Sequence, residues 1–396
     1  MKRFFSSALL LVLLSIPLCA APAAKKPWTF LVYLAGVNNL NEFAYADLAE
    51  MMKVGSNENV NVLVFFNVLL DNGSSSATQL YIEKNRAVQI TAPYTANSGN
   101  INTLKKALAW ALVDYPSDNI AVVLWDHGSG VLNKSQVLNI RGICYDDVYN
   151  SYLTDRNVLD AFTWAQNTHR KGKKFDIIAC DACLMAMVEM AYTLSNCTSY
   201  FVASQETIPG DGYEYARILN FFASGIPNPK SLAQSMIAAY QAEYVGTPDY
   251  TLSAMDSSKV PTLVDSVNQL ATFISTVLKG RKANAMRTYL AKSYSKTITF
   301  NNGIYCDMTT FLTALKSFIP KIGLTKADAT KLESLIGAVN TALKQAVIAK
   351  VASTSYKNTG GLSFYFPPYE IDSSYYNLHW TEKNPYMLQL LESYLQ

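Results

Sequence analysis

The chain has few cysteines and histidines, and no long apolar run after its first segment. There are six cysteines and three histidines in 396 residues, a cysteine density that excludes a small disulfide-stapled fold. No later stretch approaches the ~20 apolar residues needed to cross a bilayer, so we expect no membrane span. Lys and Arg number 33 against 30 Asp and Glu. This near balance, without a basic run, argues against nucleic acid as a partner.

The N-terminus has the three parts of a secretory signal peptide. Residues 1–3 are basic at two positions, residues 8–18 are almost wholly apolar, and small residues follow. The apolar segment is too short for a membrane anchor, which is the main alternative. A lipid anchor on Cys19 is disfavoured because Leu18 stands where a small residue is needed. We therefore expect a signal peptide at 1–21 and a secreted or periplasmic protein.

Apolar strand patterns alternate with helical patterns through the first half of the chain. Strands that are apolar throughout are typical of a mainly parallel sheet with helices on both faces. We expect strands at 28–34, 60–66, 119–125, 175–179 and 200–203, a hairpin at 79–83 and 87–91, and helices at 41–54, 102–115, 153–169 and from about residue 184.

The second half of the chain is predominantly helical by its pattern. We divide the mature chain into an α/β domain at 25–250 and a helical region at 251–396. Gly361–Phe366 is a late strand followed by two prolines. Because proline suits edge positions, we expect this strand to return to the edge of the sheet. Helices are expected at 231–244, 259–279, 283–293 and 326–353.

Removal of a signal peptide at 1–21 leaves an odd number of cysteines. An odd count in an exported protein predicts at least one free thiol, unless chains cross-link. The sequence does not give their pairing. The cysteines are Cys144, Cys180, Cys183, Cys197 and Cys306.

A histidine and a cysteine follow two of the expected buried strands. His127 comes directly after 119–125, and Cys183 comes shortly after 175–179. Functional groups in open α/β sheets gather in the crevice outside the carboxyl ends of the strands. Neither His169 nor His379 immediately follows a buried strand. The sequence therefore points to His127 and Cys183 as candidate partners.

The two residues fit nucleophilic catalysis by a thiol. His127 would take the proton of Cys183, because the thiolate is the reactive form. The backbone N–H groups of Gly128 and Cys183 would receive a developing oxyanion. We also expect Cys183 to begin a helix, whose positive end would lower the thiol pKa.

Other functions fit the same residues, and the residues alone leave them open. Cys183 is equally compatible with a small buried apolar residue, and His127 with a structural hydrogen-bonding group. Cys180 and Cys183 form a C-x-x-C between a strand and a helix, as in thioredoxin-like redox proteins. A metal site of His127, Cys180 and Cys183 would lack a fourth protein ligand. A non-catalytic exported protein is the remaining alternative.

The ordered motifs resemble those of the clostripain family of cysteine peptidases. Residues 124–130 are similar to its histidine motif, and residues 175–178 with 181–185 are similar to its nucleophile motif. Further similar segments follow the same order along nearly the whole mature chain: 28–40, 141–147, 206–215 and 361–367. The resemblance implies a caspase-like three-layer α/β/α sandwich, as in gingipains and legumains.

The resemblance also implies an activity. It implies a cysteine endopeptidase with a dyad of His127 and Cys183, acting through a thioacyl-enzyme and cutting after Arg or Lys. Asp181 and Asp211 match positions that bind the basic side chain by charge pairing. The alternative for each aspartate is a turn or helix-cap role. The partners implied are protein or peptide substrates, and we expect a monomer.

Two further expectations concern processing and cofactors. Family members often cut themselves between the histidine and cysteine motifs, and Lys134 and Arg141 are the favoured sites by position. Some members need calcium. Val37 stands where the family tends to carry Asp, so we expect no metal and no cofactor.

Overall fold

The computed structural model describes residues 24–132 and 142–396. Its largest sheet has nine strands in the order β13-β10-β9-β8-β5-β1-β2-β3-β4. The bounds are β1 Lys26–Gly36, β2 Val60–Leu69, β3 Ser75–Glu83, β4 Arg86–Gln89, β5 Ser117–Trp125, β8 Phe175–Asp181, β9 Thr198–Ala203, β10 Thr251–Asp256 and β13 Val347–Ala352. The central strands β2, β1, β5, β8 and β9 run parallel. The outer strands pair antiparallel, so the expected mainly parallel sheet is confirmed.

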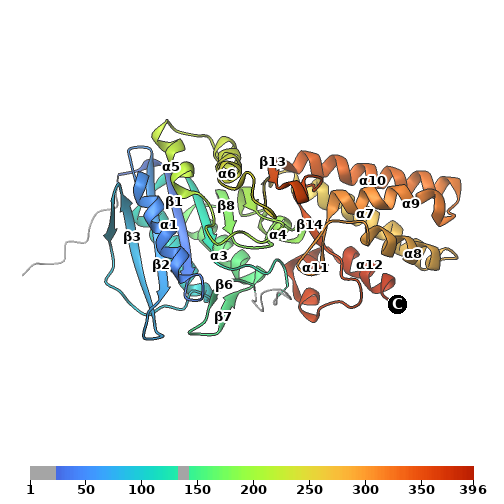
Figure 1. The fold of residues 1–396 in the computed structure, drawn as a ribbon, viewed down its shortest axis with the longest axis horizontal. Coiled ribbons are helices and arrows are strands. Elements are labelled where there is room, and N and C mark those ends of the chain that lie inside the picture. The colour runs from blue at the N-terminus through green and yellow to red at the C-terminus, as the bar shows by residue number, and fades with distance from the viewer. Residues whose placement is uncertain (1–23, 133–141) are drawn as a thin grey trace, which may run out of the picture.

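Helices cover both faces of this sheet (Figure 1). Leu31 and Tyr33 face one apolar cluster, while Phe30, Val32 and Leu34 face the other. This alternation follows from the period of two along a strand. The first cluster packs on α2 Ile101–Asp114, α3 Asp155–His169 and α4 Val188–Leu194, and the second on α1 Asn41–Val54, α5 Tyr215–Ala223 and α6 Pro229–Tyr244. The three-layer α/β/α sandwich is confirmed.

The C-terminal part is mostly helical and lies at one end of the sheet (Figure 1). Its helices are α7 Val260–Leu278, α8 Ala283–Tyr294, α9 Met308–Ile322, α10 Lys326–Ala346, α11 His379–Lys383 and α12 Tyr386–Tyr394. Between them lies a small sheet of β11 Thr299–Phe300, β12 Tyr305–Asp307 and β14 Ser363–Tyr365. We call this three-stranded sheet the small sheet. A second minor sheet pairs β6 Ile143–Asp146 with β7 Ser151–Leu153.

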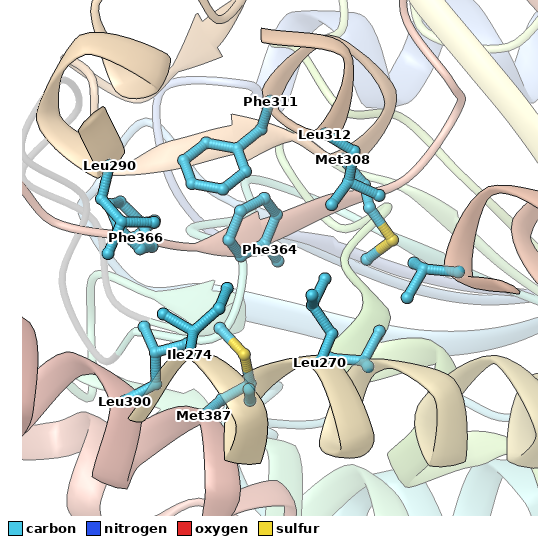
Figure 2. Close-up of a pocket in the computed structure, with 13 residues that line it drawn as sticks. Leu270, Ile274, Leu290, Met308, Phe311, Leu312, Phe364, Phe366, Met387 and Leu390 are labelled. Carbon is cyan, nitrogen blue, oxygen red and sulfur yellow. The ribbon is translucent and has the colours of Figure 1, made fainter. Parts of the chain in front are cut away.

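An apolar cavity of about 40 Å³ lies inside the C-terminal part (Figure 2). Only apolar side chains line it, among them Leu270, Phe311, Phe364 and Met387. The volume is close to that of one water molecule, and a water there would have no side-chain hydrogen-bond partner. The cavity is therefore a packing gap and contributes no chemistry.

The late strand does not return to the main sheet, so that expectation was wrong. Residues 363–365 form β14 of the small sheet, paired with β12. The edge of the main sheet is instead β13, within a segment for which the sequence predicted helix to residue 353. β13 pairs antiparallel with β10, so two of the strands after residue 250 belong to the main sheet, and the expected boundary at residue 250 cuts through that sheet. Pairing with an available edge decided this, because the run Val-Ile-Ala-Lys-Val-Ala suits either structure.

The helix expected from about Leu184 begins later. α4 starts at Val188, and Leu184 has a φ of 67°. A leucine in this left-handed region cannot continue a right-handed helix, so residues 182–187 form a loop. We call residues 182–187 the cysteine loop.

Within residues 24–132 and 142–396, no helix has the length and apolarity needed to cross a membrane. The expected signal peptide at 1–21 lies outside the described residues.

Candidate active site

Three neighbouring parallel strands end at the same edge of the main sheet. β5 lies between β1 and β8, with Leu34 opposite Trp125 and Trp125 opposite Asp181. The loops that follow these strands carry Asn39, His127 and Cys183, in that strand order. The structure therefore brings together the two side chains that the sequence predicted from strand ends.

His127 and Cys183 line one cavity of about 400 Å³. Each is 8% exposed, so each reaches the cavity while most of its surface is buried. The other lining residues come from the first loop, from the strand ends and from the loop after β9: Leu40, Trp125, Asp126, Asp181, Ala182, Thr207, Ile208, Pro209, Gly210 and Gly212.

Gly128 brings the backbones of the two loops into contact. A Cβ added to Gly128 would lie 2.4 Å from the carbonyl oxygen of Cys183 and 3.1 Å from its nitrogen. Any other residue would therefore force the two loops apart. Outside regular strand pairing, the described residues include no protein acceptor for the N–H of Gly128 or of Cys183. Cys183 lines the cavity, so its N–H can donate to an oxygen of a ligand bound there.

The imidazole of His127 has a polar partner from the first loop. Its Nε2 lies 2.7 Å from Oδ1 of Asn39. Burial lowers the pKa of His127 to about 4. The ring is therefore neutral near pH 7 and can accept a proton.

A buried pair holds the two loops that carry these groups. Nδ2 of Asn38 donates to Oδ1 of Asp126 at 2.7 Å. In the sequence, Asn38 directly precedes Asn39 and Asp126 directly precedes His127. Burial raises the pKa of Asp126 well above its usual range. Nδ2 of Asn38 also donates to the carbonyl of Tyr145 at 3.1 Å, which ties β6 to the same place.

The cysteine loop is held by the segment after β9. The N–H of Ile208 donates to Sγ of Cys183 at 3.3 Å, and the N–H of Leu184 donates to the carbonyl of Glu206 at 3.2 Å. Burial raises the pKa of the Cys183 thiol to about 11, despite the lowering effect of the Ile208 N–H. The expected helix N-terminus does not lower this pKa, because α4 begins at Val188.

Asp181 forms a buried carboxylate in the wall of the same cavity. Its Oδ2 accepts from the N–H of Tyr213 at 3.0 Å and from the hydroxyl of Tyr215 at 2.9 Å. Burial raises its pKa above the usual range. Within the described residues, no Lys or Arg pairs with Asp181. The cavity therefore contains a buried acid without a basic partner.

A second buried carboxylate, which the sequence did not predict, lies near the first. Asp47 of α1 is 2% exposed and accepts from Nε1 of Trp125 at 2.5 Å. Burial and the nearby Asp181 both raise its pKa. The available signal was its position among Ala44, Leu48 and Met51 on the buried face of the helix, where an acid is rare without a partner.

Comparison with known proteins decides the family. The family model described as "Clostripain family" matches residues 32–387. The chain belongs to the clostripain family. Its members are cysteine peptidases, and the resemblance of the ordered motifs is confirmed.

Individual relatives agree with this assignment. Clostripain from Hathewaya histolytica is 28% identical over 228 residues, covering 50% of this chain and 42% of that protein. The chain thus aligns with less than half the length of this curated relative.

Solved structures of clostripain-family proteases share the fold. An inactive protease zymogen from Parabacteroides distasonis has a TM-score of 0.65 at 20% identity, covering 91% of this chain and 99% of that one. A secreted cysteine protease from Bacteroides thetaiotaomicron in complex with an irreversible peptide inhibitor has a TM-score of 0.62 at 24% identity, covering 90% and 98%.

Asp211, the second aspartate matched to the family motif, is exposed. Its neighbours Gly210 and Gly212 line the cavity, but its own side chain does not. The structure therefore places Asp181 in the wall and leaves Asp211 beside the opening. Their roles in substrate binding stay predictions.

The five described cysteines are all buried and free. Cys180 lies within β8 at 0% exposure, and burial raises its pKa far above the usual range. Cys183 lines the cavity and Cys180 does not, so the geometry gives a redox partnership no support. Across the described parts of the chain, no three His, Cys, Asp or Glu side chains gather in a metal-binding group.

The expectation of no metal and no cofactor, calcium included, stays a prediction. In the first loop the apolar side chain of Val37 is 0% exposed, and Oδ1 of Asn38 accepts from the N–H of Leu40. The two favoured self-cleavage sites, Lys134 and Arg141, lie outside the described residues.

Proposed function

We propose that this protein is a cysteine endopeptidase that cuts peptide bonds after Arg or Lys, with Cys183 as nucleophile and His127 as base. One observation carries the proposal. The two side chains line the same cavity, while Gly128 brings its backbone against that of Cys183. The family assignment supports the reaction class, since clostripain-family proteins are cysteine peptidases.

The raised thiol pKa and the lowered imidazole pKa define the resting state. Near pH 7 both groups are neutral, so His127 acts as a general base during attack rather than as a preformed cation. The sulfur of Cys183 attacks the scissile carbonyl carbon while its proton passes to His127. The carbonyl oxygen becomes an oxyanion, which the N–H groups of Gly128 and Cys183 receive.

The intermediate then collapses and the peptide bond breaks. His127 returns its proton to the leaving amine, and a thioester joins the substrate acyl group to Cys183. Water attacks the thioester while losing a proton to His127, and the bond from carbon to Sγ of Cys183 then breaks. The sulfur recovers the proton from His127 as the carboxylic acid departs, so the complete cycle returns the dyad to its neutral state.

We propose that Asn39 selects the tautomer of His127. With its Oδ1 as acceptor, the hydrogen of the neutral imidazole resides on Nε2. The other nitrogen, Nδ1, is then the free base. Asn39 is a positioning residue, because it acts through His127.

The unpaired acid of Asp181 supports the preference for Arg or Lys. A basic side chain entering the cavity would gain a charge-assisted hydrogen bond to a carboxylate already held by Tyr213 and Tyr215. The nearby Asp47 adds no charge to this wall near pH 7, because burial and Asp181 raise its pKa to about 9. Asp211 contributes from the opening of the cavity.

Quenched peptides that differ only in the residue before the cut bond test the proposal. We expect turnover with Arg and Lys, little with citrulline or norleucine, and none by Cys183→Ala. Turnover by Cys183→Ala equal to that of wild type would contradict the assignment of Cys183 as the nucleophile. Equal turnover of Arg and citrulline peptides would remove the proposed specificity while leaving the peptidase function standing.

Self-cleavage and export are part of the proposal. We expect the purified wild-type chain to be cut after Lys134 or Arg141, and Cys183→Ala to stay whole on a denaturing gel. An uncut and active wild type would overturn the self-cleavage step.

N-terminal sequencing of the protein recovered outside the cytoplasm checks the signal peptide at 1–21, and size-exclusion chromatography checks the expected monomer.

A further inference from the structure

Two adjacent strands of the small sheet each contact one loop of the active site. Tyr305 of β12 reaches the segment after His127, and Ser363 of β14 reaches the cysteine loop. The strands pair with each other, with Tyr305 opposite Tyr365. The small sheet of the C-terminal part therefore contacts both of the loops that carry the proposed dyad.

The hydroxyl of Tyr305 holds the segment after His127 at two points. It donates to the carbonyl of Ser129 at 2.5 Å and accepts from the N–H of Leu132 at 3.3 Å. The Tyr305 side chain is 0% exposed, so no water competes for these bonds. Losing the hydroxyl would leave a buried carbonyl and a buried N–H without this partner.

Gly130 lies against the ring of the same tyrosine. It has a φ of 69°, and an added Cβ would lie 2.6 Å from Cε2 of Tyr305 and 2.8 Å from Sδ of Met187. The chain after His127 is thus enclosed between a side chain of the C-terminal part and one of the cysteine loop. It cannot move without displacing one of them.

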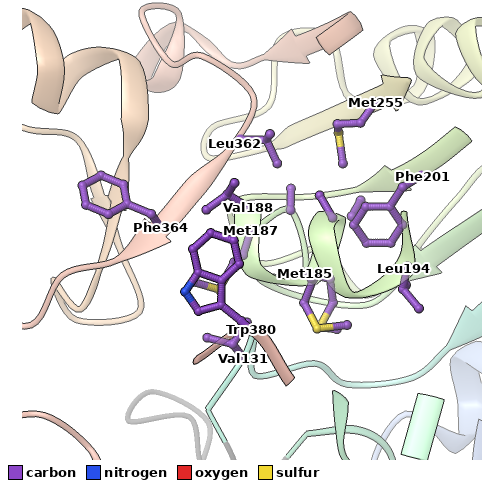
Figure 3. Close-up of a cluster of buried hydrophobic side chains, with 14 of the residues drawn as sticks. Val131, Met185, Met187, Val188, Leu194, Phe201, Met255, Leu362, Phe364 and Trp380 are labelled. Carbon is purple, nitrogen blue, oxygen red and sulfur yellow. The ribbon is translucent and has the colours of Figure 1, made fainter. Parts of the chain in front are cut away.

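The cysteine loop is attached to the next strand of the small sheet. The N–H of Ser363 donates to the carbonyl of Ala186 at 2.9 Å, and Met187 forms a parallel bridge with Ser363. Figure 3 shows Met185, Met187 and Val188 in one buried cluster with Leu362, Phe364 and Trp380.

We propose that Tyr305 is a positioning residue for the peptidase reaction, whose hydroxyl fixes the loop of His127 and Gly128 relative to Cys183. This inference rests on the proposed function. The ring of Tyr305 fills space, but the hydroxyl alone makes the two bonds to Ser129 and Leu132. Its removal should therefore impair the alignment of the base and the oxyanion donor more than it impairs folding.

Tyr305→Phe tests the proposal, with Tyr365→Phe as the matched control. Tyr365 is a buried tyrosine opposite Tyr305, but its hydroxyl accepts from the N–H of Asp372 and contacts neither loop of the active site. Active sites are counted with an irreversible peptidyl ketone, and kcat and KM are measured per counted site. We expect Tyr305→Phe to lower kcat about tenfold with KM within about twofold, the size of one lost aligning hydrogen bond. Tyr365→Phe should keep the wild-type kcat.

The outcomes separate this inference from the function on which it rests. A wild type without turnover would overturn the proposed function itself. An active wild type with equal kcat in Tyr305→Phe would overturn the positioning role. A Tyr305→Phe chain that does not melt cooperatively, while Tyr365→Phe does, would also overturn it, because the hydroxyl would then serve folding.

Discussion

Oδ1 of Asn39 lies 2.7 Å from Nε2 of His127, although the two residues are separated by 88 positions in the chain. Parallel pairing of β1 with β5 brings their loops to the same edge. The exposed asparagine thus sets the ring orientation of a mostly buried base.

Asn39→Ala should lower kcat about fivefold, because a neutral hydrogen bond that orients the base contributes about 1 kcal/mol. KM should change little, since Asn39 does not line the cavity. Steady-state kinetics with an Arg peptide measure both quantities.

Asn39→Asp is the matched variant for this prediction. It keeps an oxygen at the same place and adds a charge, so kcat should largely recover and the pKa of His127 should rise. Equal loss in both variants would argue against a role through the imidazole.

Asp181→Asn should lower kcat/KM for an Arg peptide by about 100-fold, which corresponds to a lost charge-assisted hydrogen bond to the substrate. The kcat/KM for a citrulline peptide should change much less, because that side chain carries no charge. The ratio of the two substrates is the measurement.

Asp211→Asn is the control within the same motif set. Its exposed side chain interacts through water, so we expect a loss of only about twofold to threefold. A larger loss in Asp211→Asn than in Asp181→Asn would reverse the assignment of the main acid.

The pH dependence of kcat/KM should differ between charged and neutral substrates. The pKa of Asp181 is raised, so its negative charge disappears as pH falls through a value above the ordinary aspartate range. The pKa of His127 is lowered to about 4, so the base stays neutral and available well below that point. As the pH is lowered, kcat/KM for the Arg peptide should therefore begin to decrease at a higher pH than kcat/KM for the citrulline peptide.

The variant Asp181→Asn provides the check on this acid limb. It should shift the limb for the Arg peptide down toward that of the citrulline peptide. Identical limbs for the two substrates in the wild type would contradict the role of Asp181.

Glu189 of α4 should make stability depend on pH. It is 1% exposed, and Oε1 accepts from the N–H of Tyr365 at 2.9 Å, while Oε2 has no hydrogen-bond partner among the described residues. Burial raises its pKa from 4.5 to about 7. The folded state keeps the proton over this interval while the unfolded state loses it, so the free energy of unfolding should fall as pH rises from about 4.5 to about 7.

Glu189→Gln removes this contribution. The free energy of unfolding of the variant, relative to that of wild type, should increase by on the order of 3 kcal/mol as the pH rises from 4 to 8. Denaturant unfolding of both chains at each pH measures the difference. Glu392→Gln, on an exposed position of α12, should follow wild type throughout; a gain equal to that of Glu189→Gln would contradict the assignment.

The sequence by itself determined the fold class and pointed to His127 and Cys183, which the structure brings to one cavity. Apolar runs alternating with helical patterns require a buried parallel sheet, and His127 and Cys183 each follow such a run. Because parallel strands end at a common edge, their side chains were expected to meet. The ordered motifs added the family.

Only the tertiary structure decided what surrounds that pair. Asn39 reads as a turn residue and Asp47 as one more polar position on a helix, since their partners are distant in the chain. The start of α4 was misplaced because a single positive φ at Leu184 is invisible in the residue pattern. Sheet pairing decided the place of β14, and through it the contact of Tyr305 with Ser129. Local pattern sets what a segment can form, whereas pairing and burial of distant segments set what it contacts.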